Sequence, residues 1–210
     1  MSVYRPPSFA ARDATATEQA IHDYPFATLI TARQPEPQIS HLPLLFHAAP
    51  APNGILIGHM ARANPHWRLF GEGPTMAVFQ AAHAYVSPSW YGEPEKAVPT
   101  WNYAVVHVHG RVELVEDRAA TLAILNEMID RFESGRTAPW RLQLVGRELD
   151  AMVNAIVAFR LAIERVDTKL KLSQNRSAVD RQRVVEALRA EDSADASATA
   201  DWMQRYAGEA

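Results

Sequence analysis

Segments in which apolar and polar residues alternate recur along the chain between residues 26 and 166. Alternation with a period of two puts successive side chains on opposite faces of a strand, so each segment indicates a half-buried strand. The clearest is VAFRLAIERV at 157–166, where Val157, Phe159, Leu161 and Ile163 share one side. The other predicted strands are FATLIT at 26–31, QISHLPLLFH at 38–47, GILIGHM at 54–60, TMAVFQAA at 75–82 and AVVHVHGRVELV at 104–115.

Helical periodicity marks a smaller number of segments. Asp117 is well placed to cap the clearest helix, and Ser177 with Asp180 has the pattern of a capping box ahead of another. An earlier helix follows Asp13 and is stopped by Pro25. Behind Asp117, the apolar residues at helical spacing are Leu122, Leu125, Ile129 and Phe132. Behind Ser177, they are Val184, Val185 and Leu188. Residues 147–157 are predicted to form a further helix.

Strands outnumber helices, and no regular alternation of strand and helix is present. This favours an antiparallel barrel over a doubly wound parallel sheet, so the predicted class is mainly β with flanking helices (β+α). We predict one domain over residues 1–190 that ends with a C-terminal helix. Residues 191–210 are rich in Ala, Ser, Asp and Thr, a composition that buries little, and are predicted to be a tail, although Trp202 and Tyr206 are large enough to dock.

Composition narrows the functional classes. With 210 residues and 48% hydrophobic content, the chain can bury one substantial core. A formal net charge of -3 argues against a surface built throughout for polyanions. There are no cysteines, which excludes disulfides, thiolate metal sites and iron-sulfur clusters. Neither a signal-like start nor a run of eighteen apolar residues is present, so we expect a cytoplasmic protein with no membrane segment.

Two polar segments have the chemistry to bind an anion. In GHMARANPHW at 58–67, the planar guanidinium of Arg62 and the side-chain amide of Asn64 can bind a phosphate at the end of a strand. The alternative is that Arg62 forms a surface ion pair and Asn64 an Asx turn. In KLSQNRS at 171–177, a dense set of donors precedes a helix N-terminus. The alternative there is an ordinary solvated loop.

Two aromatic segments have the chemistry to bind a flat ligand. HAYVSPSWYG at 83–92 presents hydroxyls and large rings that would line a planar ligand or act only as a lid. In VPTWNY at 98–103, an extended backbone would place Thr100 and Asn102 on one side and Trp101 on the other.

Eight histidines raise a metal or haem alternative. His107 and His109 share one side of a predicted strand, and other histidines lie on other strands. Carboxylates that often complete a metal site without thiolates are scarce near them, which weakens this alternative. We therefore predict no metal site.

Several of these motifs, in the same order and at matching spacings, make the chain resemble the PaiB-like family of FMN-binding transcriptional regulators. The resemblance covers roughly residues 1–190 and depends on Tyr4-x-Pro6 with Phe9, YPFATLIT, SHLPLL, GHMARANPHW, YVSPSWY, VPTWNYAVVHVHG and KLSQNRS. It implies membership of the FMN-binding split-barrel superfamily, with a six-stranded antiparallel split β-barrel, a homodimer and FMN at the subunit interface. One departure is Gln80-Ala81, where the family pattern has Gly-Pro.

Carried onto this sequence, the resemblance implies a flavin site. Arg62, Ala63 and Asn64 would hold the phosphate, Thr100 to Asn102 would lie beside the ring, and KLSQNR would close the site. The whole predicted set is His41, His59, Arg62, Ala63, Asn64, Trp90, Thr100, Trp101, Asn102, Lys171, Gln174 and Asn175. No residue is predicted to be catalytic, although His41 and His59 are the candidates for any proton transfer.

Three functional classes remain open. The first is an FMN-binding negative regulator of transcription, which contacts DNA directly or through a partner protein. Arg176, Arg181 and Arg183 with Lys169 and Lys171 form its only candidate basic patch, and no helix-turn-helix is visible. The second is a flavin-dependent oxidoreductase that uses NAD(P)H on a small molecule. The third is a split-barrel protein that binds haem or a metal.

Overall fold

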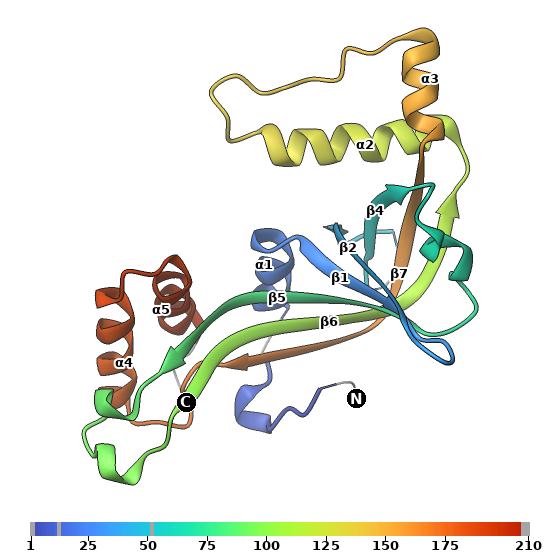
Figure 1. Ribbon diagram of the computed structural model, residues 1–210. Coiled ribbons are helices and arrows are strands. Elements are labelled where there is room, and N and C mark those ends of the chain that lie inside the picture. Colours follow the sequence, from blue (N-terminus) through green and yellow to red (C-terminus); the bar gives the residue numbers. More distant parts are fainter. Residues whose placement is uncertain (1–2, 12–13, 51–52, 207–210) are drawn as a thin grey trace. The chain divides into compact units, whose positions relative to one another are not determined.

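The computed structural model describes residues 3–11, 14–50 and 53–206 (Figure 1). The strands are β1 (Phe26–Thr31), β2 (Gln38–Pro43), β3 (Leu45–His47), β4 (Ile55–Ala61), β5 (Thr75–Val86), β6 (Thr100–Val115) and β7 (Ile156–Lys171). The helices are α1 (Thr15–Asp23), α2 (Arg118–Glu133), α3 (Gly146–Asn154), α4 (Ala178–Ala190) and α5 (Ala194–Tyr206). Four short 3-10 turns are η1 (Pro7–Phe9), η2 (Pro65–Leu69), η3 (Pro88–Trp90) and η4 (Pro94–Lys96).

The predicted class, mainly β with flanking helices, is confirmed. The strands of the described chain form one sheet in the order β2-β1-β5-β6-β7-β4-β3, with β2 and β3 at its edges. β1 pairs antiparallel with β2 and β5, and β4 pairs antiparallel with β3 and β7. The described strands number seven in an open order, so the expected six-stranded barrel is not what the structure shows.

Most predicted strands are present, with four main differences: one strand is divided and three are longer than predicted, among them β5, which continues to Val86 rather than ending at residue 82. The segment predicted as one strand over 38–47 is divided at Leu44, whose amide donates to the carbonyl of Pro25 instead of to a neighbouring strand (2.9 Å). β6 begins at Thr100 rather than Ala104, and β7 continues to Lys171 rather than ending at residue 166. The added residues are largely polar, so apolar alternation does not reveal them.

The helix caps explain where α2 and α4 begin. Asp117 accepts a hydrogen bond from the amide of Ala120 (2.7 Å), and Ser177 accepts one from the amide of Asp180 (3.1 Å). Both caps satisfy amides that the first turn of a helix leaves free, as predicted. Asp13, the cap predicted for the first helix, lies outside the described residues.

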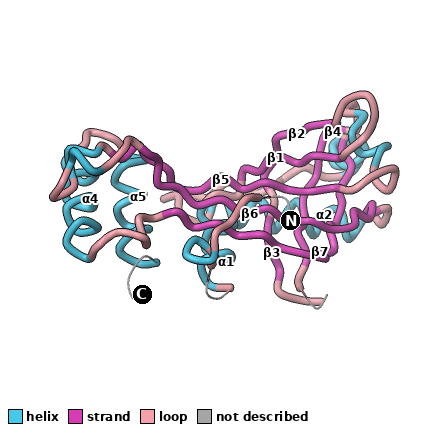
Figure 2. The backbone as a smooth tube through the Cα atoms, turned by 90° about the horizontal axis from the view of Figure 1, so that it is seen from below, coloured by secondary structure: helices cyan, strands magenta, loops and turns pink. Residues whose placement is uncertain are grey.

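By its internal contacts, the chain divides into two compact units. The α2 unit comprises residues 25–78 and 108–166, and the α4–α5 unit comprises residues 1–24, 79–107 and 167–210. β5, β6 and β7 each contribute residues to both units. Figure 2 shows β5 and β6, which are neighbours in the sheet, running side by side.

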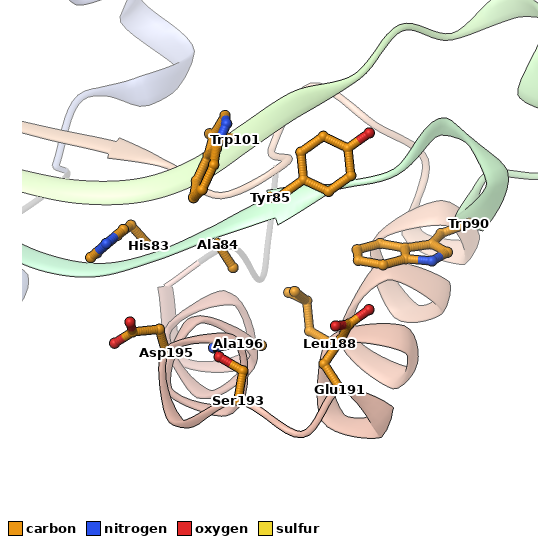
Figure 3. Close-up of a pocket in the computed structure, with 10 residues that line it drawn as sticks. All are labelled: His83, Ala84, Tyr85, Trp90, Trp101, Leu188, Glu191, Ser193, Asp195 and Ala196. Carbon is orange, nitrogen blue, oxygen red and sulfur yellow. Dashed lines mark hydrogen bonds between the residues drawn. The ribbon is translucent and has the colours of Figure 1, made fainter.

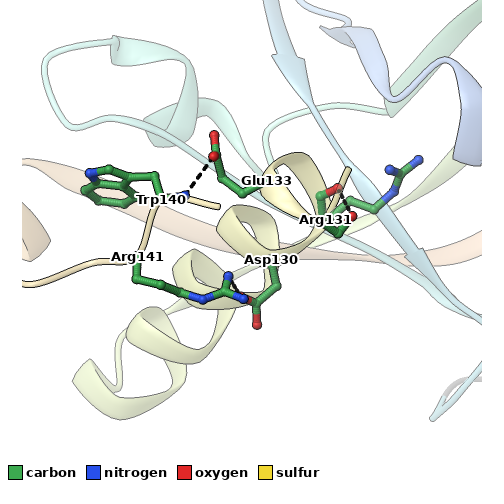
Figure 4. A network of polar contacts seen from close by, with 6 residues as sticks. Asp130, Arg131, Glu133, Trp140 and Arg141 are labelled. Carbon is green, nitrogen blue, oxygen red and sulfur yellow. Dashed lines mark hydrogen bonds and ion pairs between the residues drawn. The ribbon is translucent and has the colours of Figure 1, made fainter. Parts of the chain in front are cut away.

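In the α2 unit, the apolar side of α2 covers the edge of the sheet. Ile124 and Met128 of the helix pack into one cluster with residues from β3, β4 and β7. The segment that follows α2 is tied back to it, because the amide of Trp140 donates to Glu133 (2.9 Å) and Arg141 forms an ion pair with Asp130 (Figure 4). The sheet residues of the cluster are Leu45, Ile55, Ile57 and Ala158.

In the α4–α5 unit, α4 and α5 pack against each other (Figure 1). Leu188 of α4 and Trp202 and Met203 of α5 are buried, and the Trp202 ring contacts the rings of Tyr24 and Tyr206. The sequence predicts a tail over residues 191–210, whereas Ala194–Tyr206 of this segment form α5. The end of the domain at residue 190 remains a prediction.

Candidate functional site

The turn after β4 is built around Arg62 and Asn64, in the α2 unit. The Asn64 side chain accepts from the amide of His66 (3.0 Å), which forms the Asx turn that opens η2. Arg62 donates through Nε to the carbonyl of Asn154 (2.6 Å) and through Nη2 to that of Ile156 (2.7 Å). Of the two interpretations of Asn64, the turn is therefore present, and Arg62 holds backbone carbonyls rather than a carboxylate.

Donors remain on the outer side of this turn. Arg62 and Ala63 are exposed. The amides of Arg62 and Asn64 donate to the carbonyls of Ala155 and Ala61, whereas the Ala63 amide and Arg62 Nη1 have no hydrogen bond to a described residue. The turn therefore presents the guanidinium of Arg62 beside the backbone N-H of Ala63, and donors of this kind bind phosphate.

A buried polar network lies beneath the turn. Asn64 Nδ2 donates to Ser40 Oγ (2.9 Å), and Ser40 Oγ lies 2.8 Å from His66 Nδ1. His66 Nε2 lies 2.9 Å from Thr31 Oγ1, which in turn lies 2.9 Å from the Thr75 hydroxyl. Burial lowers the pKa of His66, so the ring is held neutral and the network fixes its two nitrogens.

The two predicted histidines of the α2 unit have different surroundings. His41 on β2 is exposed; its Nδ1 lies 3.1 Å from Thr28 Oγ1 and its ring stacks on Phe26. His59 on β4 is partly buried with Nδ1 3.3 Å from the sulfur of Met128, and burial lowers its pKa. A neutral His59 at physiological pH is therefore expected.

The start of β6 and the loop 171–177 meet in the α4–α5 unit. Lys171 Nζ donates to Thr100 Oγ1 and to the carbonyl of Trp101, both at 2.6 Å. Burial, with Lys169 and Arg176 nearby, lowers the pKa of Lys171. The ammonium has three protons and these bonds use two, so one N-H and the proton of the Thr100 hydroxyl remain for a ligand.

The amides of Asn102 and Gln174 fix the loop instead of facing outward. Asn102 is 1% exposed; its Nδ2 donates to Ser173 Oγ (2.9 Å), and that hydroxyl lies 3.2 Å from Asn102 Oδ1. Gln174 accepts from the amide of Leu172 (2.7 Å) and donates to the carbonyl of Leu170 (2.6 Å). Both side chains position the loop, whereas Asn175 is exposed.

The aromatic members of the predicted set lie close to one pocket. Trp101 on β6 is 52% exposed, opposite in direction to the buried Asn102, as the extended backbone predicted. Trp101 and Trp90 line a pocket of about 270 Å³ with residues of β5, α4 and α5 (Figure 3). All of its lining residues belong to the α4–α5 unit.

The structure thus places the predicted residues in two groups. His41, His59, Arg62, Ala63 and Asn64 belong to the α2 unit. The other seven, Trp90, Thr100, Trp101, Asn102, Lys171, Gln174 and Asn175, belong to the α4–α5 unit. Sequence reasoning missed Ser40, His66 and Ser173, which hold these groups in place. For Ser40 the sequence does carry a signal, because strand alternation places it on the same side as Leu42, and both residues are buried.

Comparison with known proteins then decides the family. Residues 3–165 match the family described as "Putative FMN-binding domain". The Bacillus subtilis protein named protease synthase and sporulation protein PAI 2 is 33% identical over 207 residues, which cover 96% of this chain and 97% of the relative. The chain belongs to this FMN-binding family. The resemblance to PaiB-like proteins and the FMN cofactor are both confirmed.

Solved structures similar to this member of the FMN-binding family support the fold. The flavocytochrome Anf3 from Azotobacter vinelandii has a TM-score of 0.62 at 19% identity, covering 80% of this chain and 72% of that one. The FAD and haem binding protein from Mycobacterium smegmatis has a TM-score of 0.57 at 23% identity, covering 76% of this chain and 71% of that one. At these identities the likeness establishes the shared fold.

Metal-ion clusters and membrane-spanning helices are both absent from the described residues. Over the described residues, no group of three or more His, Asp or Glu side chains is arranged to hold a metal ion. Within the same part of the chain, no helix has both the length and the apolar character needed to cross a bilayer.

Proposed function

We propose that this protein is an FMN-binding regulator of transcription that acts as a homodimer. The observation that carries the regulatory role is the similarity, over 96% of this chain, to a relative named protease synthase and sporulation protein PAI 2. Sporulation is a cellular process rather than a substrate, which favours regulation over catalysis on a small molecule.

Considered unit by unit, each group leaves donors of a kind that a part of FMN can accept. Arg62 and the Ala63 amide would hold the phosphate, since both combine exposure with unused N-H groups. In the α4–α5 unit, taken by itself, Lys171 and Thr100 are donors of the kind that a flavin ring carbonyl accepts. Asn64, Asn102 and Gln174 would act as positioning residues, because their amides are already bonded within the chain.

Bound FMN supplies one- and two-electron redox chemistry. The residues proposed around its ring supply little acid-base chemistry of their own. Thr100, Asn102 and Gln174 do not titrate near neutral pH, and Lys171 is the one ammonium among them. This set is better suited to holding a flavin than to protonating a substrate.

The experiment begins with purified protein reconstituted with FMN. Under anaerobic conditions, NADH or NADPH is added and the flavin absorbance near 450 nm is followed (a general value for flavins). We expect slow bleaching or none. Rapid bleaching with turnover on an acceptor would make the protein an oxidoreductase instead.

DNA binding is then measured as a function of salt. For a regulator that contacts DNA directly, affinity falls steeply with salt as phosphate contacts release counterions. Arg183→Gln, in the candidate basic patch, should lower the slope of log affinity against log salt by about one. Arg147→Gln on the exposed surface of α3 is the matched control and should leave the slope unchanged. An affinity for DNA that does not fall as the salt concentration rises would contradict direct contact between this protein and DNA.

A further inference from the structure

The pocket in the α4–α5 unit has aromatic walls (Figure 3). His83 and Tyr85 come from β5, Trp101 from β6 and Trp90 from η3. The Trp101 ring stacks on His83 with centroids 6.3 Å apart and meets Tyr85 edge-on at 6.2 Å. Because Tyr85 and Trp101 are 44% and 52% exposed, these rings present their surfaces to the pocket and to solvent rather than to the core.

The opposite side of the pocket carries negative charge. Glu191 and Asp195 line it from the end of α4 and the start of α5, and Figure 3 shows both carboxylates on the side of the pocket away from Trp101. Both are exposed, and neither side chain has a hydrogen bond or ion pair to a described residue. Within the described part of the chain, no cation is paired with either carboxylate.

The position of Glu191 is unfavourable for the helix that bears it. Glu191 is the C-cap of α4, where the partial negative charge of the helix end repels a carboxylate. Asp195 lies in the first turn of α5, where a carboxylate is ordinarily favourable, and Ser193 caps that helix through the amide of Ala196 (3.3 Å). A role in stabilising a helix explains why Asp195 and Ser193 stand at their positions, but it does not explain Glu191.

The charge of the residues that line the pocket determines whether it favours an anionic or a cationic ligand. Among the described residues that line the pocket, none is Lys or Arg, and the two carboxylates are those of Glu191 and Asp195. Such a pocket repels a phosphate, so the anionic end of FMN does not fit it. Ring faces attract cations through their negative quadrupole, and nearby carboxylates add to that attraction.

We propose that this pocket binds an organic ammonium ion, with its charge between the aromatic walls and the carboxylates of Glu191 and Asp195. A volume of about 270 Å³ accommodates a small alkylammonium group. Half of the lining, Leu188 to Ala196, follows residue 165, beyond the part of the chain that matches the FMN-binding family. The pocket therefore lies only in part within the matched domain, and competition by FMN distinguishes it from the flavin site.

The test compares choline with its uncharged isostere 3,3-dimethylbutan-1-ol, and then with butylammonium. The full-length protein is titrated at constant ionic strength, with tryptophan fluorescence and calorimetry as readouts. We expect saturable binding of choline or butylammonium and at least tenfold weaker binding of the neutral alcohol, because only the cations gain the ring and carboxylate attraction. No saturable binding of either cation, or equal binding of the alcohol, would overturn the proposal.

Variants then locate the binding. The double variant Glu191→Gln with Asp195→Asn should weaken the cation about tenfold or more, whereas Asp192→Asn, an exposed neighbour outside the lining, should change it less than twofold. Both changes are on the surface, and thermal melts confirm equal folding. Unchanged affinity in the double variant would refute the site. Displacement of choline by FMN would also refute it, since the pocket would then be part of the flavin site.

Discussion

At the scale of single residues, the side chain of Arg62 has both a structural role and a proposed binding role. Its Nε and Nη2 hold the carbonyls of Asn154 and Ile156, while Nη1 is left for a ligand. Arg62→Ala should weaken FMN by about 2 kcal/mol, because a charge-assisted hydrogen bond to phosphate is lost. Flavin fluorescence titration measures this, and Arg68→Ala, an exposed arginine in the same turn, should bind FMN normally. Equal affinity in Arg62→Ala would remove Arg62 from the phosphate site.

His66 gives the protein a defined response to acid. Burial lowers its pKa below the ordinary 6.5, and the same holds for His59. Below pH 6.5 the unfolded chain takes up protons that the folded chain resists, so stability falls as the pH falls and levels off above that value. We expect the urea midpoint to drop as the pH is lowered from about 7 to about 5.

The histidine responsible is identified by substitution. His66→Gln should reduce this pH dependence, although it also lowers stability at neutral pH because the buried network loses a member. An identical slope in His66→Gln and the native chain would show that His66 is not the group involved.

At the scale of elements, the loop 171–177 depends on the first residues of β6. Asn102→Ala would leave the hydroxyl of Ser173 buried without its partner, at a cost of about 1–3 kcal/mol in unfolding free energy. FMN affinity should fall as well, since Lys171 and its neighbours lose their support. Asn175→Ala should preserve stability, because Asn175 is exposed. Urea unfolding of Asn102→Ala that matches the native chain would contradict this.

Helix α5 is a structural part of the protein. Trp202 is 4% exposed and contacts the rings of Tyr24 and Tyr206. Trp202→Ala should lower the unfolding free energy by about 3–5 kcal/mol through the cavity it leaves. Ser197→Ala, on the exposed side of the same helix, serves as the control. Native-like stability after removal of residues 191–210 would instead support a domain that ends at residue 190.

The elements differ in how well the sequence predicts them, for a physical reason. β1 and the caps of α2 and α4 were predicted because apolar alternation and capping residues mark them directly. The first four residues of β6 and the last five of β7 were not, because Asn102, Asp167, Thr168 and Lys169 are polar and yet buried. Helix α5 was missed because small residues such as Ala196 and Ala200 fill its buried side.

The candidate site was predictable in residue type but not in the task of each residue. The motifs identified Asn64, Asn102 and Gln174, whose amides the structure shows bonded within the chain. Whether an amide faces a ligand or its own backbone depends on contacts between distant segments, such as Asn102 with Ser173. No local pattern contains that information.

At the scale of the whole molecule, we predict a homodimer. The outer side of β1 and β2 leaves Phe26 and Ile39 67% and 46% exposed, and β2 is an edge strand. A second copy that covers these residues would bury apolar area and protect the edge. Light scattering should report twice the monomer mass at micromolar concentration. Ile39→Glu should yield monomers while Gln34→Glu does not, and a monomeric native protein with flavin bound would contradict the prediction.

The division of the chain between the two units affects how the protein is made. The backbone passes from one unit to the other at residues 24–25, 78–79, 107–108 and 166–167, so neither unit is a continuous stretch of sequence. β7, the last strand along the described part of the chain, contributes to both. A nascent chain that has not released residues 156–171 from the ribosome thus lacks a strand of each unit. Folding of both units therefore waits until β7 has left the ribosome, and until then the growing polypeptide exposes unpaired strands.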